Sequence, residues 1–422
     1  MSAPPVYDNE GYRATPLPAY HARTYSVSGS RGSTEHEFPL NERKTKIRAM
    51  LKVISDAPSR ESLPVILEGG SLVGSLVVHV PKSEKVTGVL ILVRGELWLG
   101  GTHEPWTNGA APRPDNFRFL DLSVPLWEKS QEGGGLLGDY NWPFSIPVPK
   151  EVLLEDPLSS GRKIKRNYNL PPTLQEQRGA VSIRYSISAR IVYKTMFLEG
   201  DTQVQATFVY VPVLRPEPPT QARQSAYQSR LPIPGPLLDP GGWHHCESVT
   251  IKGTVFNVRP VEIICLLSLA LPLSYTRGGF IPCFLTYHCS DPQALDLIAA
   301  PSAISISLQR HITCASIFTG NGHCSPPVND TQECARAVFW PADPTQQYHN
   351  RRAFEGEIAL PKTLKPTSAI AHFTLQYFVI IKPPRVIGFA SARATNQPLL
   401  RQDVQVGTVF PRGPRPISYS PI

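Results

Sequence analysis

The second half of the chain brings histidine next to cysteine in three places, a pairing able to hold zinc or to activate a thiolate nucleophile. No pair has the C-x2-C or H-x3-5-H spacing that brings two ligands to one ion, and adjacent residues on a strand point to opposite faces. We therefore expect structural cysteines and surface histidines, while the alternative of a Cys-His nucleophile stays open. The residues are His244, His245 and Cys246, His288 and Cys289, His323 and Cys324, and beyond them Cys334.

Motifs of other enzyme classes are absent from the sequence. It contains no G-x-S-x-G elbow and no G-x-x-x-x-G-K-[ST] phosphate loop, and the glycine run at 133–135 lies in a polar stretch. Tryptophans at 98, 106, 127 and 142 are interpreted as core or loop anchors rather than as a sugar-binding face. The sequence thus predicts no enzyme, no cofactor and no metal site.

Peptide recognition is indicated near the N-terminus, where residues 4–7 read Pro-Pro-Val-Tyr and residues 17–20 read Leu-Pro-Ala-Tyr. A Pro-Pro step holds the backbone near polyproline II, so little entropy is lost on binding, and the tyrosine adds a flat amphipathic ring. WW domains bind such segments in aromatic grooves; a plain proline-rich tail is the alternative. The residues assigned to WW-domain binding are Pro4, Pro5 and Tyr7, with Leu17, Pro18 and Tyr20 as a weaker auxiliary.

Positive charge gathers in two clusters suited to an anionic partner. The chain carries 42 basic against 34 acidic residues, a net charge of +8, and the guanidinium fork of arginine fits phosphate. A solvated face is the ordinary alternative, and nucleic acid is disfavoured because neither cluster has interleaved aromatics. The first cluster is Arg43, Lys44, Lys46, Arg48 and Lys52. The second, a candidate phosphate or lipid contact, is Arg162, Lys163, Lys165 and Arg166.

Composition favours two or three globular domains in a cytoplasmic protein. The chain has 422 residues, 41% of them hydrophobic, and its 44 prolines argue for short connections and against long helices. The apolar run at 263–273 is too short to cross a bilayer. Because the N-terminus is polar and the seven cysteines are odd in number, we expect reduced thiols in the cytosol.

Alternating apolar and polar residues predict an all-β body. The clearest strand is 181–193, with a return strand at 202–211 after a turn at 198–201. Further upstream, 72–80 and 86–99 are predicted as strands separated by a polar turn at 82–84. One buried and one wet face per strand is the pattern of a β-sandwich.

A proline-rich segment after residue 213 divides the chain, and a second strand series follows it. We expect the strands of this series at 249–258, 261–270, 304–308, 354–360 and 370–381. Loops are predicted at 102–116 and 128–139, and a long mobile loop at 313–350. The architecture predicted is two tandem antiparallel immunoglobulin-like β-sandwiches.

Six short phrases, in this order and spacing, resemble those of a known family. The first four are Glu-Gly-Gly-Ser-Leu-Val-Gly at 68–74, Ile-Leu-Val-Arg-Gly at 91–95, Trp-Pro-Phe-Ser-Ile-Pro at 142–147 and Arg-Tyr-Ser-Ile-Ser-Ala-Arg at 184–190. The last two are Lys-Gly-Thr-Val-Phe-Asn at 252–257 and Gly-Phe-Ile-Pro at 279–282. Together they resemble an arrestin-like protein of the fungal type, in which an arrestin N-like domain precedes an arrestin C-like domain.

The resemblance implies the arrestin fold and a trafficking adaptor. Such an adaptor binds cytosolic regions of membrane transporters or receptors and recruits a WW-domain HECT-type ubiquitin ligase, which promotes ubiquitination and endocytosis of the cargo. The expected location is cytoplasmic, peripheral at the plasma membrane or endosomes, with an anionic membrane surface as a further partner. The alternatives are a ligase-independent scaffold that binds cargo or phospholipid and, last, a β-sandwich enzyme with an unrecognised site.

The expected organisation has five parts. They are a disordered tail at 1–42, an arrestin N-like sandwich at 43–213, a proline-rich linker at 214–245, an arrestin C-like sandwich at 246–400 and a C-terminal tail at 401–422.

Overall fold

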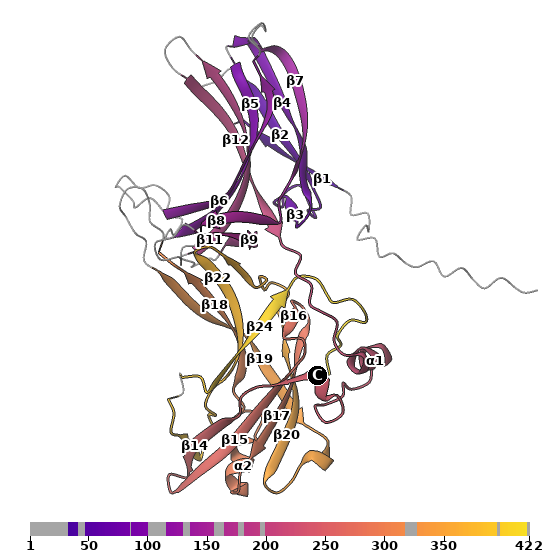
Figure 1. Ribbon diagram of the computed structural model, residues 1–422, viewed down its shortest axis with the longest axis vertical. Coiled ribbons are helices and arrows are strands. Elements are labelled where there is room, and N and C mark those ends of the chain that lie inside the picture. The colour runs from indigo at the N-terminus through magenta and orange to yellow at the C-terminus, as the bar shows by residue number, and fades with distance from the viewer. Residues whose placement is uncertain are drawn as a thin grey trace, which may run out of the picture.

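The computed structural model describes residues 33–40, 47–84, 86–99, 115–129, 136–155, 164–175, 181–194, 199–316, 327–394 and 397–419. Within these ranges about 60% of the residues are in β-strands and few are in helices, which confirms the all-β class. Its α-helices in these ranges are the short α1 (Gln221–Ser229) and α2 (Pro292–Ile298). Two lobes follow one another along the long axis of the molecule, as the sandwich prediction requires (Figure 1).

The first lobe encloses its core between two sheets. One has the order β1-β2-β4-β7, and the other has the order β3-β12-β11-β5-β6, with β10 beside β11. The first sheet comprises β1 (Thr34–Pro39), β2 (Arg48–Ser55), β4 (Ser71–Glu84) and β7 (Leu136–Pro147). The second comprises β3 (Val65–Leu67), β12 (Glu199–Val211), β11 (Val181–Lys194), β5 (Val86–Leu99), β6 (Asp115–Glu128) and β10 (Leu174–Gln175). A separate hairpin is formed by β8 (Glu151–Glu155) and β9 (Lys165–Asn169).

Strand β11 shows why the sequence pattern was informative. Its alternate residues Ile183, Tyr185 and Ile187 are fully buried, and the strand pairs with β5 on one side and β12 on the other. Burial of one face is what the apolar and polar alternation predicted. The predicted strand at 181–193 is therefore confirmed.

The polar turn expected at 82–84 is wrong. Strand β4 continues to Glu84, which pairs with Leu136 of β7 after a register shift that begins at Val80. Strand β5 begins almost at once but belongs to the other sheet. Lysine, serine and glutamate are tolerated in this strand because a bulge accommodates a local change of register without ending the pairing.

The second lobe forms one continuous set of strands in the order β16-β24-β22-β18-β19-β20-β17-β15-β14-β23. Strand β13 adds to β15, and β21 adds to β22. The bounds are β13 (Trp243–His245), β14 (Val249–Val255), β15 (Arg259–Ala270), β16 (Ser274–Thr276), β17 (Phe280–His288), β18 (Ile306–Cys314), β19 (Val328–Pro341), β20 (Arg351–Ala359), β21 (Ser368–Ile370), β22 (Phe373–Ile381), β23 (Phe389–Ser391) and β24 (Leu400–Gly407). Short 3-10 turns occur at Pro240–Gly242 and Pro344–Gln346.

The predicted mobile loop at 313–350 is wrong over much of its length because it contains β19. The first part of this strand pairs with β18 and the last part with β20, so it joins the two layers of the second lobe. Within β19 only Phe339 is buried. A strand exposed along most of its length has no apolar alternation, and its polar composition therefore looked like a loop.

Four of the predicted tail and loop segments also prove shorter, because strands extend into them. Strand β1 lies in the segment expected as tail at 1–42, and β24 lies in the segment expected as tail at 401–422, where it pairs with β22. Strands β6 and β7 begin inside the loops predicted at 102–116 and 128–139. Partner strands elsewhere in the sequence satisfy the backbone groups of these segments, and such partners are not visible in a local pattern.

The predicted linker at 214–245 folds onto the second lobe. Helix α1 carries Arg223, which is only 2% exposed and donates hydrogen bonds to the carbonyl oxygens of Leu271 (2.7 Å) and Gly242 (2.5 Å). Its guanidinium lies 5.2 Å from the ring centre of Trp243, at the start of β13. Burial lowers the pKa of Arg223. This buried cation holds the segment against the lobe.

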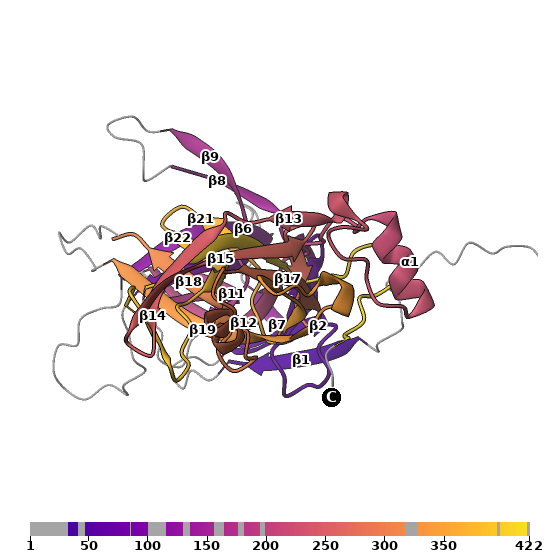
Figure 2. The ribbon, with the colours of Figure 1, turned by 90° about the horizontal axis from the view of Figure 1, so that it is seen from below.

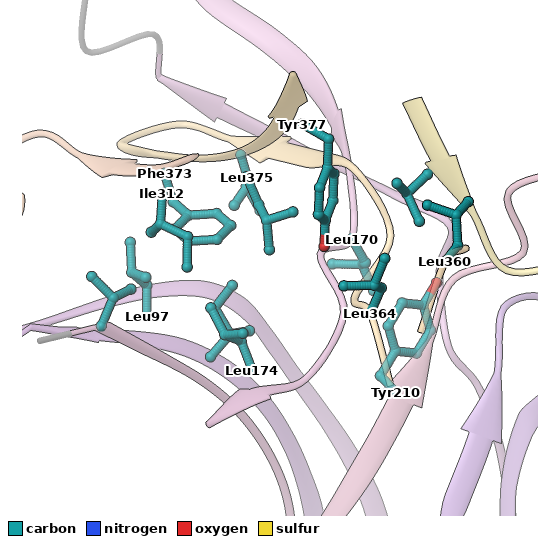
Figure 3. Close-up of a cluster of buried hydrophobic side chains, with 14 of the residues drawn as sticks. Leu97, Leu170, Leu174, Tyr210, Ile312, Leu360, Leu364, Phe373, Leu375 and Tyr377 are labelled. Carbon is teal, nitrogen blue, oxygen red and sulfur yellow. The ribbon is translucent and has the colours of Figure 1, made fainter. Parts of the chain in front are cut away.

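The two lobes share one hydrophobic cluster where they meet (Figure 3). Side chains of β5, β10, β12 and the chain before β10 face side chains of β18, β22 and the segment after β20. The labelled members are Leu97, Leu170, Leu174 and Tyr210 from the first lobe, and Ile312, Leu360, Leu364, Phe373, Leu375 and Tyr377 from the second. Because this apolar surface is removed from water only when the lobes meet, it favours one arrangement of the two.

Candidate functional site

The residues assigned to WW-domain binding lie outside the described residues. These are Pro4, Pro5, Tyr7, Leu17, Pro18 and Tyr20. The first described strand is β1, which forms an edge of the four-stranded sheet and pairs with β2 alone. The described chain therefore enters the first lobe at a sheet edge rather than through its core.

The second basic cluster is partly described. Arg162 and Lys163 lie outside the described residues, whereas Lys165 and Arg166 are exposed at the start of β9. Across the hairpin their register partners are Glu155 and Leu154. In Figure 2 the hairpin projects from the body of the molecule.

Apolar side chains accompany these cations on the hairpin. Leu153 of β8 is 61% exposed, and Ile164, directly before β9, is 46% exposed. Exposed large apolar residues beside basic residues on a protruding element are typical of surfaces that contact lipid headgroups and the outer part of the acyl region. The hairpin can therefore offer both an electrostatic and an apolar contact.

The first basic cluster is also described only in part. Three of its members, at 43, 44 and 46, lie outside the described residues. Arg48 and Lys52 lie on β2, where the Lys52 amine pairs with Glu35 (3.0 Å) and Glu37 (2.8 Å) of β1. These ion pairs lower the pKa of Glu37 and raise that of Lys52. Lys52 is thus part of a cross-strand network on an exposed face.

The described tryptophans of the first lobe already have partners. Arg184 lies 5.2 Å over the ring of Trp98, Tyr140 stacks on Trp142 at 5.2 Å, and Trp127 packs against the core. Position 106 lies outside the described residues. A sugar-binding face requires exposed, unoccupied rings, so these side chains fit the structural interpretation.

Five of the six described cysteines are buried. Burial raises the pKa of Cys246 to about 11 and those of Cys265 and Cys314 to about 12, and it also raises that of Cys283. A thiol with such a pKa is protonated near neutral pH, so it is a poor nucleophile and a poor metal ligand. Cys334 is the partly exposed one, and residues 323 and 324 lie outside the described ranges.

The histidines beside these cysteines make structural contacts. The His244 ring lies 3.0 Å from the Gln402 side chain and the His245 ring 2.7 Å from the Ser268 hydroxyl, while burial lowers the pKa of His288. No group of three or more His, Cys, Asp or Glu in the described ranges is arranged to hold a metal ion. The reading of these residues as structural fits this geometry.

One site escaped the sequence reasoning, a cavity of about 210 Å³ in the second lobe. Aromatic rings and two carboxylates of β20 line it, and Trp340 Nε1 donates to Glu355 Oε2 at 3.4 Å. Burial raises the pKa of Glu355. The lining includes Trp243, Phe284, Trp340, Glu355, Glu357 and Tyr419.

The sequence gives little indication of this cavity, because the residues that line it come from distant parts of the chain. The one local sign is the Glu-Gly-Glu sequence at 355–357, since alternate glutamates point to the same face of a strand. On that face of β20 Ala353 is buried, and Glu357 is only 6% exposed. A carboxylate on a buried strand face requires a partner, and that partner proves to be the C-terminal segment.

No protein-family model matches the chain, and no curated protein matches it. Within the described ranges, neither helix has the length and apolar content required to span a bilayer. Function must therefore be inferred from the residues and the fold.

Proposed function

We propose that this chain is an arrestin-like trafficking adaptor. In this proposal it binds cytosolic regions of membrane transporters or receptors, and its N-terminal segment recruits a WW-domain HECT-type ubiquitin ligase. The observation that carries the proposal is the Pro-Pro-Val-Tyr segment at 4–7 placed ahead of two tandem all-β lobes. Burial raises the pKa values of the Cys246, Cys265 and Cys314 thiols, which makes them poor nucleophiles and favours a binding protein over a thiol-dependent enzyme.

The shared interface of the lobes supports an adaptor that presents several surfaces at once. Beside the hydrophobic cluster, Thr408 Oγ1 donates to the Pro212 carbonyl (2.8 Å) and accepts from the Leu214 amide (2.9 Å). Glu68 Oε2 accepts from the Val213 amide at 2.8 Å. These bonds tie the crossover between the lobes to both of them. A cargo contact on either lobe would then stand at a defined distance from the entry point of the N-terminal segment at β1.

Binding of the full chain to a protein that contains several WW domains tests the ligase step. We expect Tyr7→Ala to weaken binding by roughly thirtyfold, since truncating an aromatic anchor costs about 2 kcal/mol or more. Tyr20→Ala should weaken it less, because the second motif contributes mainly through effective concentration. Both variants should have the same melting temperature as the wild type. Unchanged binding of the Tyr7→Ala protein to WW domains would contradict the proposal.

The β8–β9 hairpin favours a second candidate, a scaffold that contacts an anionic membrane surface without the ligase. Each basic residue near such a surface contributes about 1 kcal/mol, so loss of both Lys165 and Arg166 corresponds to roughly thirtyfold weaker binding. The test is cosedimentation of the full chain with vesicles that contain phosphatidylserine. The double variant Lys165→Glu/Arg166→Glu should lose at least that much binding.

A matched control reverses two other exposed cations, Arg230→Glu and Lys362→Glu, at sites remote from the hairpin. This control has the same net charge as the hairpin variant. Equal losses in the two proteins would mean that net charge, and not the hairpin, determines vesicle binding.

A further inference from the structure

The C-terminal segment closes the aromatic cavity of the second lobe. After β24 the chain runs past α1 (Figure 1) and reaches the cavity at Tyr419. The Tyr419 hydroxyl donates to the Leu231 carbonyl at 2.5 Å, and its ring forms part of the cavity lining. We call residues 415–419 the latch.

Glu357 of β20 is the anchor of the latch. Its Oε2 accepts a hydrogen bond from the Ser418 hydroxyl at 2.7 Å, and its Oε1 accepts one from the Tyr419 amide at 2.6 Å. The side chain is otherwise enclosed, with 6% exposure. Both carboxylate oxygens are thus satisfied by donors of the latch, and a buried carboxylate is stable only when it is satisfied in this way.

Ser418 is exposed, whereas its hydrogen-bond partner Glu357 is buried. An enzyme can therefore reach the hydroxyl that holds the buried carboxylate. We propose that Ser418 is a phosphorylation site and that its modification releases the latch from Glu357 and opens the cavity. In the reaction a protein kinase transfers the γ-phosphoryl group of ATP. The Ser418 Oγ–P bond forms, the bond between the β- and γ-phosphates breaks, ADP leaves and the hydroxyl proton goes to the kinase base or water.

Electrostatics explains the release. Phosphorylation replaces a donor by a group that only accepts and that carries about −1.5 to −2 charges at neutral pH. That charge arises within hydrogen-bond distance of a carboxylate in a poorly solvated wall, to which Glu355 also belongs. Like charges in such a place repel strongly. When the latch leaves, the hydrogen bond from the Tyr419 amide to Glu357 is also lost.

A basic residue of the latch is the competing partner for the phosphate. The Arg415 guanidinium lies 5.2 Å over the ring of Phe410. If the phosphate instead paired with Arg415 and stayed in place, the latch would remain closed. The experiment must therefore report the position of the latch and not merely the presence of the phosphate.

The test incorporates phosphoserine at position 418 of the full chain and follows hydrogen exchange in peptides that cover 411–419. A second readout is tryptic cleavage after Arg412, which is exposed, because the Arg415–Pro416 bond resists trypsin. We expect exchange and cleavage to accelerate at least tenfold. Phosphoserine at the exposed Ser59 of the first lobe is the control and should leave both rates unchanged. Unchanged rates with phosphoserine at 418 would overturn the proposal.

Two variants separate repulsion from simple loss of a hydrogen bond. Ser418→Ala removes the donor without adding charge, so it should accelerate exchange much less than phosphoserine does. In the Glu357→Gln protein, phosphoserine at 418 should accelerate exchange much less than in the wild type, because the amide is neutral and still accepts from the Tyr419 amide. Equal acceleration by Ser418→Ala and phosphoserine, or full acceleration in the Glu357→Gln background, would refute release by repulsion.

Discussion

Replacing Arg223 with methionine tests whether a buried cation attaches α1 to the second lobe. Methionine keeps most of the length of the aliphatic stem but has no guanidinium, so packing changes little while two hydrogen bonds disappear. The buried Leu271 carbonyl oxygen would then lose this donor, while the Gly242 oxygen would keep the hydrogen bond from the Leu271 amide at 2.7 Å. The contact with the ring of Trp243 would also be lost.

The size of the effect follows from these contacts. Loss of the guanidinium leaves the buried Leu271 carbonyl without this donor, which costs about 1 to 3 kcal/mol, and removes one charge-assisted hydrogen bond from the Gly242 oxygen, which costs about 1.5 to 3 kcal/mol, so the two together cost roughly 2.5 to 6 kcal/mol. Burial lowers the pKa of Arg223, which indicates that desolvation of this cation is itself costly. The methionine variant does not have this desolvation cost, which offsets part of the loss. We expect a net loss of about 3 kcal/mol in the free energy of unfolding. For a lobe of this size that corresponds to a melting temperature lower by roughly 6 to 12 °C.

Differential scanning calorimetry of the full chain measures this loss. Gln228→Ala is the matched control, because Gln228 is exposed on the same helix and alanine suits a helix. It should melt within about 1 °C of the wild type. If Arg223→Met were to lose less than about 0.5 kcal/mol, the buried guanidinium would not be what holds α1, and the reasoning would fail.

Two further predictions concern a strand contact and a titrating side chain. Gly74→Ala should lower the free energy of unfolding by about 2 kcal/mol or more in a denaturant titration, since a Cβ there would overlap the Lys52 carbonyl and lie 2.8 Å from Phe144. Burial lowers the pKa of His372, so the unfolded chain binds its proton more readily and stability should fall as the pH drops below about 6.5. In the His372→Gln protein the free energy of unfolding should change less with pH, and His288, whose pKa is also lowered by burial, should account for the change that remains. If the pH dependence were the same as in the wild type, His372 would not be its cause.

Several elements were predictable because local pattern and tertiary environment agree. Strand β11 alternates in sequence, pairs with a strand on each side and packs its apolar face into the core, so the sequence pattern and the structure coincide. Strands β5, β15 and β22 also lie close to the positions expected for them. Among the site residues, Lys165 and Arg166 were selected by charge and are exposed.

Other elements were missed because their stability comes from partners that are distant in the sequence. Strand β19 is mostly exposed and takes its hydrogen bonds from β18 and β20. The helix in the predicted linker has few apolar residues and depends on Arg223 for its attachment. Strand β24 lies beyond the boundary placed at 400 but pairs with β22.

The sequence by itself determined the all-β class, several of the longer strands and the two short tail motifs, because period-two alternation and proline-rich peptide chemistry are local properties. The tertiary structure decided the rest. It joined the lobes through one hydrophobic cluster, and it buried Cys246, Cys265 and Cys314, which raises the pKa values of their thiols. It also brought Ser418 to Glu357 across 61 residues of sequence. These features depend on which groups share a buried space, and burial is a property of the folded chain as a whole.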